Sequence, residues 1–392
     1  MTTTVNNEHK NIKVPNLRFP EFEGEWEKCK VSDLLDFYST NSLSWDKLEY
    51  GTDAIQNLHY GLIHVGLPTM IDLSKDKLPN ITNDNTPKNY ELCQEGDIAF
   101  ADASEDTNEV AKAVEFYKLN GKDVICGLHT IHGRDNQQKT VVGYKGYAFS
   151  STAFHHQIRR IAQGTKIYSI NSKNFSECYI GIPSKEEQKK IATLLRLIDE
   201  RIVTQNKIID KLQSLIKGIV QKIVHSNKTN VRLSECLECS SSTLQESDVC
   251  EHGAYAVYGA NGIVGYLDNY NTEGEAVYII KDGSGVGSVS YVTGKCSATG
   301  TLNTLQAKEG YSLQYLYYML KVFNFEPYKT GMAIPHIYFK DYGKAKFFCP
   351  SCTEQLQYAQ SLSAIDSKLL VEKNILTSLS MQKKYLLRQM YI

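Results

Sequence analysis

The hexapeptide Pro-Ser-Lys-Glu-Glu-Gln at residues 183–188 returns 167 positions later as Pro-Ser-Cys-Thr-Glu-Gln at residues 350–355. The match continues downstream at the same offset, where Ala192, Leu195, Ile198, Asp199, Ile208, Leu212 and Lys217 recur as Ala359, Leu362, Ile365, Asp366, Ile375, Leu379 and Lys384. It also begins upstream, where Gly164, Ile167, Ile170 and Lys173 pair with Gly331, Ile334, Ile337 and Lys340. Solenoid repeats have periods of about 20–50 residues, so this longer period indicates a duplicated domain. Two similar units in one chain suggest a pseudo-two-fold protein that handles a two-part target.

The repeated segment has the signals of a helix that starts at the hexapeptide. Ser184 with Glu187, and Ser351 with Glu354, each form a Ser-x-x-Glu capping box directly after a proline. Apolar residues then recur at alternating spacings of four and three, which is the seam of a left-handed coiled coil. The central positions of this seam are Ile198, Ile202, Gln205, Ile209 and Leu212 in the first copy, and Ile365, Leu369, Glu372, Leu376 and Leu379 in the second. The second seam is the weaker one, because Lys383 interrupts it.

Both seams carry a polar residue at the same middle position, Gln205 and Glu372. If the helices pack antiparallel, these side chains would meet near the pseudo-two-fold axis and fix the register of the pair. From Glu187 to Ile223 the first helix would be about 55 Å long at 1.5 Å per residue. An apolar stripe also fits the core of a single domain, but the length and recurrence of this one favour a two-helix spacer.

Length and composition are those of a soluble protein with more than one domain. The chain has 392 residues, of which 42% are hydrophobic and 22% charged, with a formal net charge of -1. Near-neutrality argues against a free-standing nucleic-acid binder, but it allows one whose partner subunit supplies much of the phosphate contact. The first ten residues lack an apolar run, and the most apolar stretch, Tyr315–Leu320, is too short to span a bilayer. We therefore expect a cytoplasmic protein, with no membrane partner, whose ten cysteines are reduced thiols.

The regions before each helix read as β-rich and irregular, so the fold class is α+β. The two units start alike at residues 31–34 and 233–236, but at an offset of 202, so the first unit holds the longer variable region. Asn-Gly at residues 261–262 and Asp-Gly at 282–283 are hairpin signals. The expected layout is a flexible tail (1–13), a first variable domain (14–181), a central helix (182–226), a second variable domain (227–348) and a C-terminal helix (349–392).

The chain lacks the motifs of a self-contained enzyme. The run from Asp282 to Gly287 resembles a phosphate loop, but it lacks Gly-Lys-Ser/Thr and continues as a strand, which favours a glycine-rich turn. There is no Pro-Pro dipeptide of an amino-methyltransferase, no Walker motif and no His-Glu-x-x-His zinc site. The adjacent His155 and His156 would point to opposite faces of a strand. We expect no catalytic residue in this chain.

Two Cys-x-x-Cys pairs, Cys236/Cys239 and Cys349/Cys352, leave zinc binding and ordinary thiols as alternatives. The pairs of a zinc site usually lie about 15–20 residues apart, and here more than a hundred residues intervene. Cys349 and Cys352 also occupy positions that hold Ile182 and Lys185 in the first copy. Ordinary thiols are favoured, and we expect no metal site.

The variable regions do carry polar side chains suited to bases and phosphates. Arg, Asn and Gln make bidentate contacts with base edges, and Lys and Arg contact phosphates, although such residues also populate any solvated loop. Candidates in the first region are Arg134, Asn136, Gln137, Lys139, His155, His156 and Arg159. Candidates in the second region are Tyr258, Asn261, Lys281, Ser284, Lys329 and His336.

This layout resembles the specificity (S) subunit of type I restriction–modification systems. The features that carry the resemblance are two variable regions, each followed by a long helix opening with Pro-Ser-x-x-Glu-Gln. The opening run at residues 14–22, followed by Trp26, and the run at 255–266 are also similar to segments of such subunits. The resemblance covers nearly the whole chain.

The resemblance implies that each variable region is a target recognition domain that reads one half of a bipartite site in double-stranded DNA. The two helices would pair antiparallel as a coiled-coil spacer and dock two methylation (M) subunits. Those subunits would bind S-adenosylmethionine, and restriction (R) subunits would use ATP and Mg²⁺, so this chain would need no cofactor. The rival hypotheses are a coiled-coil adaptor that does not read DNA and, disfavoured by the absent motifs, a self-contained nuclease–methyltransferase.

Overall fold

A computed structural model describes residues 13–392, which divide into two compact units. The first unit contains the chain up to Gln205 together with Ile375–Ile392, and the second contains Asn206–Asn374. Each long helix therefore contributes one half to each unit, whereas the predicted layout kept the helices as separate segments. The predicted tail lies, apart from Lys13, outside the described residues.

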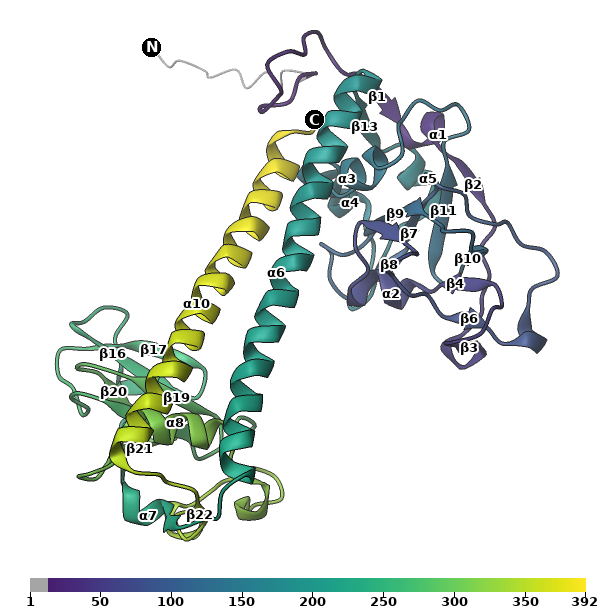
Figure 1. The fold of residues 1–392 in the computed structure, drawn as a ribbon. Coiled ribbons are helices and arrows are strands. Elements are labelled where there is room, and N and C mark those ends of the chain that lie inside the picture. The colour runs from purple at the N-terminus through teal and green to yellow at the C-terminus, as the bar shows by residue number, and fades with distance from the viewer. Residues whose placement is uncertain (1–12) are drawn as a thin grey trace, which may run out of the picture. The chain divides into compact units, whose positions relative to one another are not determined.

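The two long helices are α6 (Lys185–His225) and α10 (Cys352–Gln389), drawn in teal and yellow in Figure 1. At the start of α10 the capping box is complete, since Ser351 N donates to Glu354 Oε2 at 3.1 Å and Glu354 N to Ser351 Oγ at 3.4 Å. At the start of α6 the Ser184 hydroxyl accepts from Glu187 N at 3.3 Å, but the Glu187 carboxylate receives the Arg18 guanidinium at 2.7 and 2.8 Å. The same motif thus begins both helices with different partners.

In the first unit the two helix segments lie side by side and run in opposite directions. Lys383 of α10 pairs with Asp199 of α6 at 2.6 Å, and Leu386 and Met390 share one apolar core with Ile191. Near the start of α6, Leu17 N donates to Gln389 O at the end of α10. Lys383, which interrupts the predicted apolar seam of α10, is therefore paired with the Asp199 carboxylate of α6.

Two main sheets build the rest of the first unit. One has the order β2-β11-β7-β9-β5 and the other the order β10-β4-β6-β3, and short two-stranded pairs β1-β13 and β12-β8 complete it. The strands are β1 (Glu27–Lys30), β2 (Asp36–Tyr38), β3 (Leu48–Glu49), β4 (Gln56–Leu58), β5 (Met70–Asp72), β6 (Asn80–Ile81), β7 (Ile98–Ala101), β8 (Ala103–Ser104), β9 (Ala113–Lys118), β10 (Val124–Cys126), β11 (Thr130–Arg134), β12 (Tyr168–Ser169) and β13 (Tyr179–Ile182). The helices before α6 are α1 (Val31–Leu34), α2 (Tyr60–Val65), α3 (Tyr144–Phe149), α4 (Thr152–Ile161) and α5 (Ser172–Ser176), and short 3-10 turns cover Trp45–Lys47 and Asn83–Asn85.

Strand β7 shows how the five-stranded sheet separates two cores. All four of its residues are buried, so its sequence has no polar face. Because successive side chains of a strand point to opposite faces, Ile98 and Phe100 enter the core shared with α3, α4 and α6. Ala99 and Ala101 enter a second core together with residues of β4, β9 and β10. The sheet is therefore covered on both faces.

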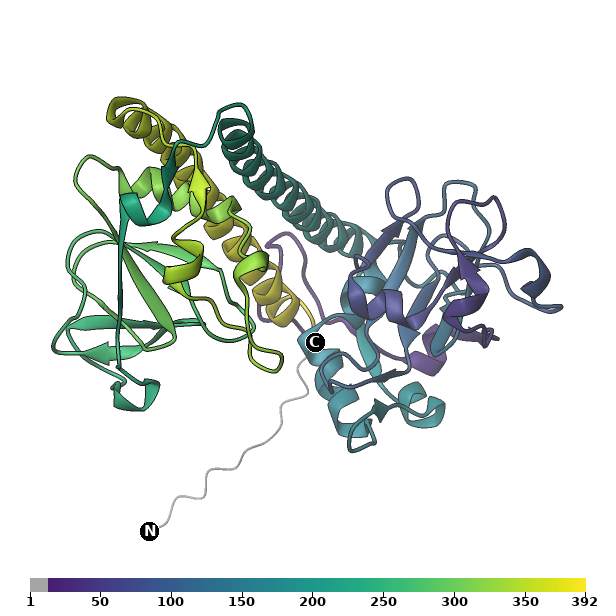
Figure 2. The ribbon, with the colours of Figure 1, turned by 90° about the horizontal axis from the view of Figure 1, so that it is seen from below.

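The second unit has sheets of different order, β15-β21-β18-β19 and β17-β16-β20, with a two-stranded pair β14-β22. Its strands are β14 (Val231–Arg232), β15 (Leu237–Ser241), β16 (Tyr255–Gly259), β17 (Gly262–Leu267), β18 (Ala276–Ile280), β19 (Val289–Val292), β20 (Ser297–Ala298), β21 (Leu302–Ala307) and β22 (Lys346–Phe347). Its helices before α10 are α7 (Leu233–Cys236), α8 (Leu313–Val322) and α9 (Phe339–Tyr342), with 3-10 turns at Glu246–Asp248 and Glu326–Tyr328. Figure 2 shows this unit in green, and α8 packs on the sheet that contains β18, β19 and β21.

Both predicted hairpins are present in the second unit. The first joins β16 and β17, where Gly262 at the turn has φ +101°. The second joins β18 and β19 through a longer loop in which Gly283 has φ +97°. The glycine-rich run at residues 282–287 is thus a turn followed by strand β19, and the phosphate-loop alternative has no helix to support it.

The mixed α+β fold with two domains and two long helices agrees with the expectation from sequence. One local expectation was wrong: His155 and His156 lie on helix α4 and not on a strand. Burial of Phe154 and Ile158 at a four-residue spacing explains the helix, because these two residues form its core-facing side. Among residues 13–392, no helix combines the length and apolar character needed to cross a bilayer.

Candidate nucleic-acid interface

In the first unit, hydrogen bonds attach helix α3 and the residues before it to β13 and to the first half of α6. Tyr144 Oη donates to Gly181 O at 2.6 Å, and Tyr147 Oη donates to Asp199 Oδ2 at 2.9 Å. The Gln188 side chain accepts from Val141 N at 2.9 Å and donates to Pro183 O at 2.9 Å. These contacts join the variable domain to the repeated hexapeptide.

The second unit repeats every one of these contacts between α8 and α10. Tyr315 Oη donates to Phe348 O at 2.9 Å, and Tyr318 Oη donates to Asp366 Oδ2 at 3.4 Å. The Gln355 side chain accepts from Ser312 N at 2.9 Å and donates to Pro350 O at 2.9 Å. The helix residues in these contacts recur at the offset of 167. Their partners in the variable domains recur at an offset of 171. A small insertion therefore hides this part of the repeat in the sequence.

Burial keeps the anchoring tyrosines protonated. It raises the pKa of Tyr147 well above the ordinary value, and the neighbouring Asp199 carboxylate adds to the shift. The pKa of Tyr318 is raised for the same two reasons, with Asp366 as the neighbour. Both phenols therefore stay protonated, and donate to the aspartates, at alkaline pH values where an exposed tyrosine would ionise.

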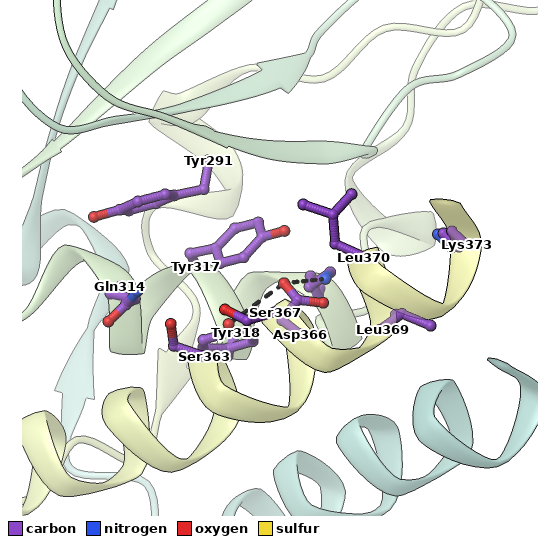
Figure 3. A pocket seen from close by; sticks show the side chains of 11 residues that line it. Tyr291, Gln314, Tyr317, Tyr318, Ser363, Asp366, Ser367, Leu369, Leu370 and Lys373 are labelled. Atoms are coloured by element: carbon purple, nitrogen blue, oxygen red, sulfur yellow. Dashed lines mark hydrogen bonds and ion pairs between the residues drawn. The ribbon is translucent and has the colours of Figure 1, made fainter. Parts of the chain in front are cut away.

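A pocket of about 410 Å³ lies beside the second anchor, between α8, β19 and α10 (Figure 3). Tyr291 and Tyr317 point into it, and Lys321 reaches Asp366 at 3.6 Å. The remaining residues that line it are Gln314, Tyr318, Ser363, Ser367, Leu369, Leu370 and Lys373. Its lining mixes aromatic and charged groups from the helix and the variable domain of one unit.

A tight loop is also repeated in the two units, at residues 163–169 and 330–336. Gln163 and Ser169 exchange backbone hydrogen bonds at 2.9 Å, as Thr330 and His336 do at 2.8 and 2.9 Å. Glycine is required at the second position, because a Cβ on Gly164 would lie 1.9 Å from Ile167 O. The match upstream of the hexapeptide, which pairs Gly164 and Ile167 with Gly331 and Ile334, falls on this loop, and His336 is the one predicted site residue that belongs to it.

Large apolar side chains at the tips of these loops are exposed to solvent. Ile167 is 62% exposed in the first unit, and Ile334 and Met332 are 65% and 106% exposed in the second. Single exposed apolar residues are common, but here Ile167 and Ile334 recur at equivalent positions of the same tight loop. A shared, exposed and preorganised apolar tip fits contact with another molecule.

The structure brings four of the second-region candidates to this loop. His336 closes the loop, Lys329 directly precedes it, and the bridge between Asp282 and His336 places Lys281 and Ser284 in the adjoining segment. Ser284 is exposed, and the other three are half-buried. The Lys329 amine pairs with Glu326 at 2.6 Å.

The other two second-region candidates lie on the β16–β17 hairpin. Asn261 is exposed at its turn, and the ring of Tyr258 packs against Tyr278.

In the first region, His155, His156 and Arg159 share helix α4. His156 and Arg159 are exposed, and Arg159 Nη1 donates to Asn108 Oδ1 at 3.4 Å. His155 is half-buried, and burial lowers the pKa of its imidazole below the ordinary value. Of the three, His156 and Arg159 are the two whose polar atoms face solvent.

The remaining first-region candidates lie around the end of β11. Asn136 and Gln137 are exposed, with Asn136 donating to Asp36 at 2.7 Å, and Lys139 donates to Asp33 O at 3.1 Å. Arg134 is buried, and its guanidinium donates to both carboxylate oxygens of Asp97 at 2.8 Å. This ion pair gives Arg134 a role within the fold, and base contact by this residue stays a prediction.

The predicted seam positions of both helices turn away from solvent. Ile198, Gln205, Ile209, Leu369, Glu372 and Leu379 are buried, and Ile202, Leu212, Ile365 and Leu376 are half-buried. Glu372 also pairs with Lys368 on its own helix. That Gln205 and Glu372 meet and fix the register stays a prediction.

Within residues 13–392, the structure brings together three metal-type ligands that the sequence did not single out, Cys93, Cys126 and His132. The cysteines weighed from the sequence fall elsewhere, with the Cys236 thiol hydrogen-bonded to that of Cys349 and Cys352 exposed. Cys93 and Cys126 are 33 positions apart and belong to no Cys-x-x-Cys pair, so the spacing rules for zinc sites give no signal for them.

Comparison with known proteins places this architecture in context. Residues 77–214 and 225–381 match the family described as the type I restriction modification DNA specificity domain. A putative type I restriction enzyme specificity subunit of Methanocaldococcus jannaschii is 26% identical over 208 residues, which cover 52% of this chain and 46% of that protein. A putative type I specificity subunit of Mycoplasma genitalium is 27% identical over 197 residues, covering 45% of this chain and 50% of that protein. The chain thus spans half or less of the length of the curated relatives it matches.

Two solved structures resemble the whole chain. The crystal structure of a type I restriction–modification S subunit from M. genitalium aligns with a TM-score of 0.65 at 18% identity, covering 97% of this chain and 99% of that one. A structure reported for complex assembly and conformational transition of the type I restriction–modification system aligns with a TM-score of 0.54 at 15% identity, covering 92% and 96%. At these identities the likeness establishes a shared fold.

Proposed function

The chain belongs to the type I restriction–modification DNA specificity family, and we propose that it is the subunit of such a system that recognises DNA. In this proposal each variable domain reads one half of a bipartite site in double-stranded DNA. The two long helices set the distance between the half-sites and dock two methylation subunits. The chain itself catalyses no reaction.

One observation carries the proposal: the same anchors hold two different domains. The contacts of Tyr144, Tyr147 and Gln188 recur with Tyr315, Tyr318 and Gln355, although the sheets attached to them differ in strand order. Two domains that recognise different DNA sequences need the same attachment to the helices but different sheets and loops. A spacer of fixed length then makes the gap between half-sites a geometric consequence.

The repeated loops are the best-supported DNA contacts within the readers. Exposed apolar tips can contact the methyl group of thymine or insert between base steps. In the second domain Lys281, Ser284, Lys329 and His336 surround the loop and offer contacts to phosphates and base edges. In the first domain the corresponding part would fall to the exposed His156 and Arg159 of α4, a helix that ends two residues before the loop.

The nearly neutral charge fits a division of labour within a complex. Phosphate contacts dominate the affinity of proteins for DNA, and a chain with a net charge of -1 supplies few of them overall. The methylation subunits would supply the remainder and bind S-adenosylmethionine. Restriction subunits, recruited through the complex, would bind ATP and Mg²⁺, which leaves this chain without a cofactor of its own.

Methylation sequencing tests the proposal directly. The chain is expressed with its methylation subunit in a host that lacks other adenine methylation, alongside the methylation subunit alone. We expect a two-part methylated motif with a fixed gap that is present only when the chain is present. A complex that assembles but yields no such motif would instead support a coiled-coil adaptor.

A further inference from the structure

Two thiols and one imidazole meet in the interior of the first unit. Cys93 Sγ and Cys126 Sγ are 3.6 Å apart, and together with a ring nitrogen of His132 these atoms all lie within 4.8 Å of one another. The three side chains are 5%, 2% and 0% exposed. The cluster is therefore closed to bulk solvent and made entirely of side chains that bind soft metal ions.

The imidazole of His132 is held by one nitrogen and unpartnered at the other. Its Nε2 lies 2.7 Å from Asp97 Oδ2, and Asp97 is itself fixed by two hydrogen bonds from Arg134. Its Nδ1 is buried without a hydrogen-bond partner. Leaving a buried polar atom unpaired is costly, and native structures rarely do so without a reason.

This arrangement is the one that metal-binding histidines use. A ligating histidine donates its other ring N–H to a carboxylate, which fixes the tautomer and leaves the free nitrogen lone pair for the metal. Asp97 meets that requirement at Nε2, so Nδ1 is the nitrogen left to act as a ligand. The backbone also positions Cys93, because Cys93 N donates at 2.8 Å to the carbonyl oxygen of Val124, the first residue of β10.

We propose that Cys93, Cys126 and His132 form a binding site for a thiophilic divalent metal ion of the zinc type. Tetrahedral zinc with Zn–S bonds of about 2.3 Å places two thiolates about 3.8 Å apart, close to the 3.6 Å observed. Each thiol releases its proton to solvent as it binds. Three protein ligands leave a fourth position for water.

A disulfide between Cys93 and Cys126 is the competing account of the same thiols. It requires the sulfur atoms to approach to about 2.05 Å, and it leaves the unpartnered Nδ1 of His132 unexplained. A metal ion accounts for both thiols, for the buried nitrogen and for the orientation imposed by Asp97. The geometry therefore favours metal binding over oxidation.

A metal ion bound at this site would stabilise the interior of the first variable domain. Cys126 ends β10 of the four-stranded sheet, His132 belongs to β11 of the five-stranded sheet, and Cys93 lies in the segment that leads into β7. A bound ion would link the two sheets and that segment. This role does not depend on DNA recognition, so the two proposals can fail separately.

Metal analysis of the untagged full-length chain tests the site. The exposed thiols Cys250 and Cys352 are first replaced by serine in every protein, so that surface thiols do not bind zinc. After loading with zinc sulfate and desalting, we expect about one zinc per chain by mass spectrometry. Cys93→Ser, Cys126→Ser and His132→Gln should each lose it, whereas Cys236→Ser, which alters a buried thiol pair in the second unit, should keep it.

Cobalt substitution provides a measurement that does not depend on the folding of variants. Co²⁺ added to the protein with native Cys93, Cys126 and His132 should give thiolate-to-cobalt charge-transfer bands that zinc abolishes. A strong chelator should lower the melting temperature of this protein, and zinc should restore it. Absence of zinc and of cobalt bands, zinc retained by Cys126→Ser, or a mass loss of two hydrogens showing a Cys93–Cys126 disulfide would each overturn the proposal.

Discussion

Tyr147 of the first variable domain donates a hydrogen bond of 2.9 Å to Asp199, which lies four turns into helix α6 and also pairs with Lys383 of α10. One carboxylate thus connects the domain with both helices of its unit. Tyr318 and Asp366 repeat the relationship in the second unit at 3.4 Å, with Lys321 of α8 in place of the lysine from the other long helix. This contact is one of the anchors that hold each domain on its helix.

Replacing Tyr147 by phenylalanine should weaken the first unit more than the matching change weakens the second. A hydrogen bond to a charged group is worth about 1.5–3 kcal/mol, and the variant loses the bond to the half-buried Asp199 without leaving a cavity. Tyr318→Phe should cost less than about 1 kcal/mol, because its contact is longer. Urea unfolding of both variants measures the difference, and equal losses would contradict the importance of the shorter contact.

The exposed tip of the repeated loop should matter for DNA and not for stability. Ile334→Ser should reduce affinity for a cognate duplex by about tenfold, which corresponds to about 1.4 kcal/mol, while the free energy of unfolding changes by less than about 0.5 kcal/mol. The reason is that Ile334 is 65% exposed and has few intramolecular contacts to lose. Fluorescence anisotropy on the assembled complex gives the affinity.

Val65→Ser is the matched control for that experiment, since Val65 is 88% exposed but lies on α2, which carries none of the candidate DNA contacts and belongs to neither long helix. It should bind DNA as the unmodified chain does. If Ile334→Ser bound as tightly as this control, the loop would not be a DNA contact.

The helices could be predicted from sequence because their signals are local. The capping boxes and the seam repeat lie within a few turns of the residues they organise, and helix α6 extends beyond the predicted Glu187–Ile223 by only two residues at each end. The ion pair of Lys383 could not be predicted, because its partner Asp199 lies on the other helix. A position that weakens the apolar seam turns out to hold an ion pair.

Contacts between residues far apart in the chain have no local signal and could not be predicted. The ion pair of Arg134 with Asp97, 37 positions earlier, is one example, and base contact by Arg134 stays a prediction. The anchoring tyrosines recur at an offset of 171, and the unmatched sequence of the variable domains conceals them. The repeated glycine loop, in contrast, carries a direct signal in the upstream match of Gly164 and Gly331.

Exchanging one variable domain should change one half of the DNA site. If residues 240–335 are replaced by those of a homologue with another specificity, the anchors Tyr144, Tyr147 and Gln188 of the first unit are untouched. We expect methylation sequencing to show a motif in which one half-site is new, while the other half-site and the gap are unchanged. Alteration of both half-sites would refute independent readers.

Lengthening the helices should lengthen the gap. Four extra residues within Lys207–Lys217 of α6, with four in the equivalent stretch 374–384 of α10, add about 6 Å to each helix. Since B-DNA rises about 3.4 Å per base pair, the methylated motif should gain about two base pairs between its half-sites. The added rotation of about 40° is small enough for both readers to reach the duplex.

Insertion into α6 alone is the control for this experiment. It shifts the apolar seam of one helix against an unchanged partner, so positions such as Ile209 and Leu379 can no longer both be buried. We expect this variant to lose DNA methylation or to assemble poorly with methylation subunits, as measured by size-exclusion chromatography and methylation sequencing. A doubly lengthened protein that assembled normally and still methylated the original motif with the original gap would show that the helices do not set the spacing.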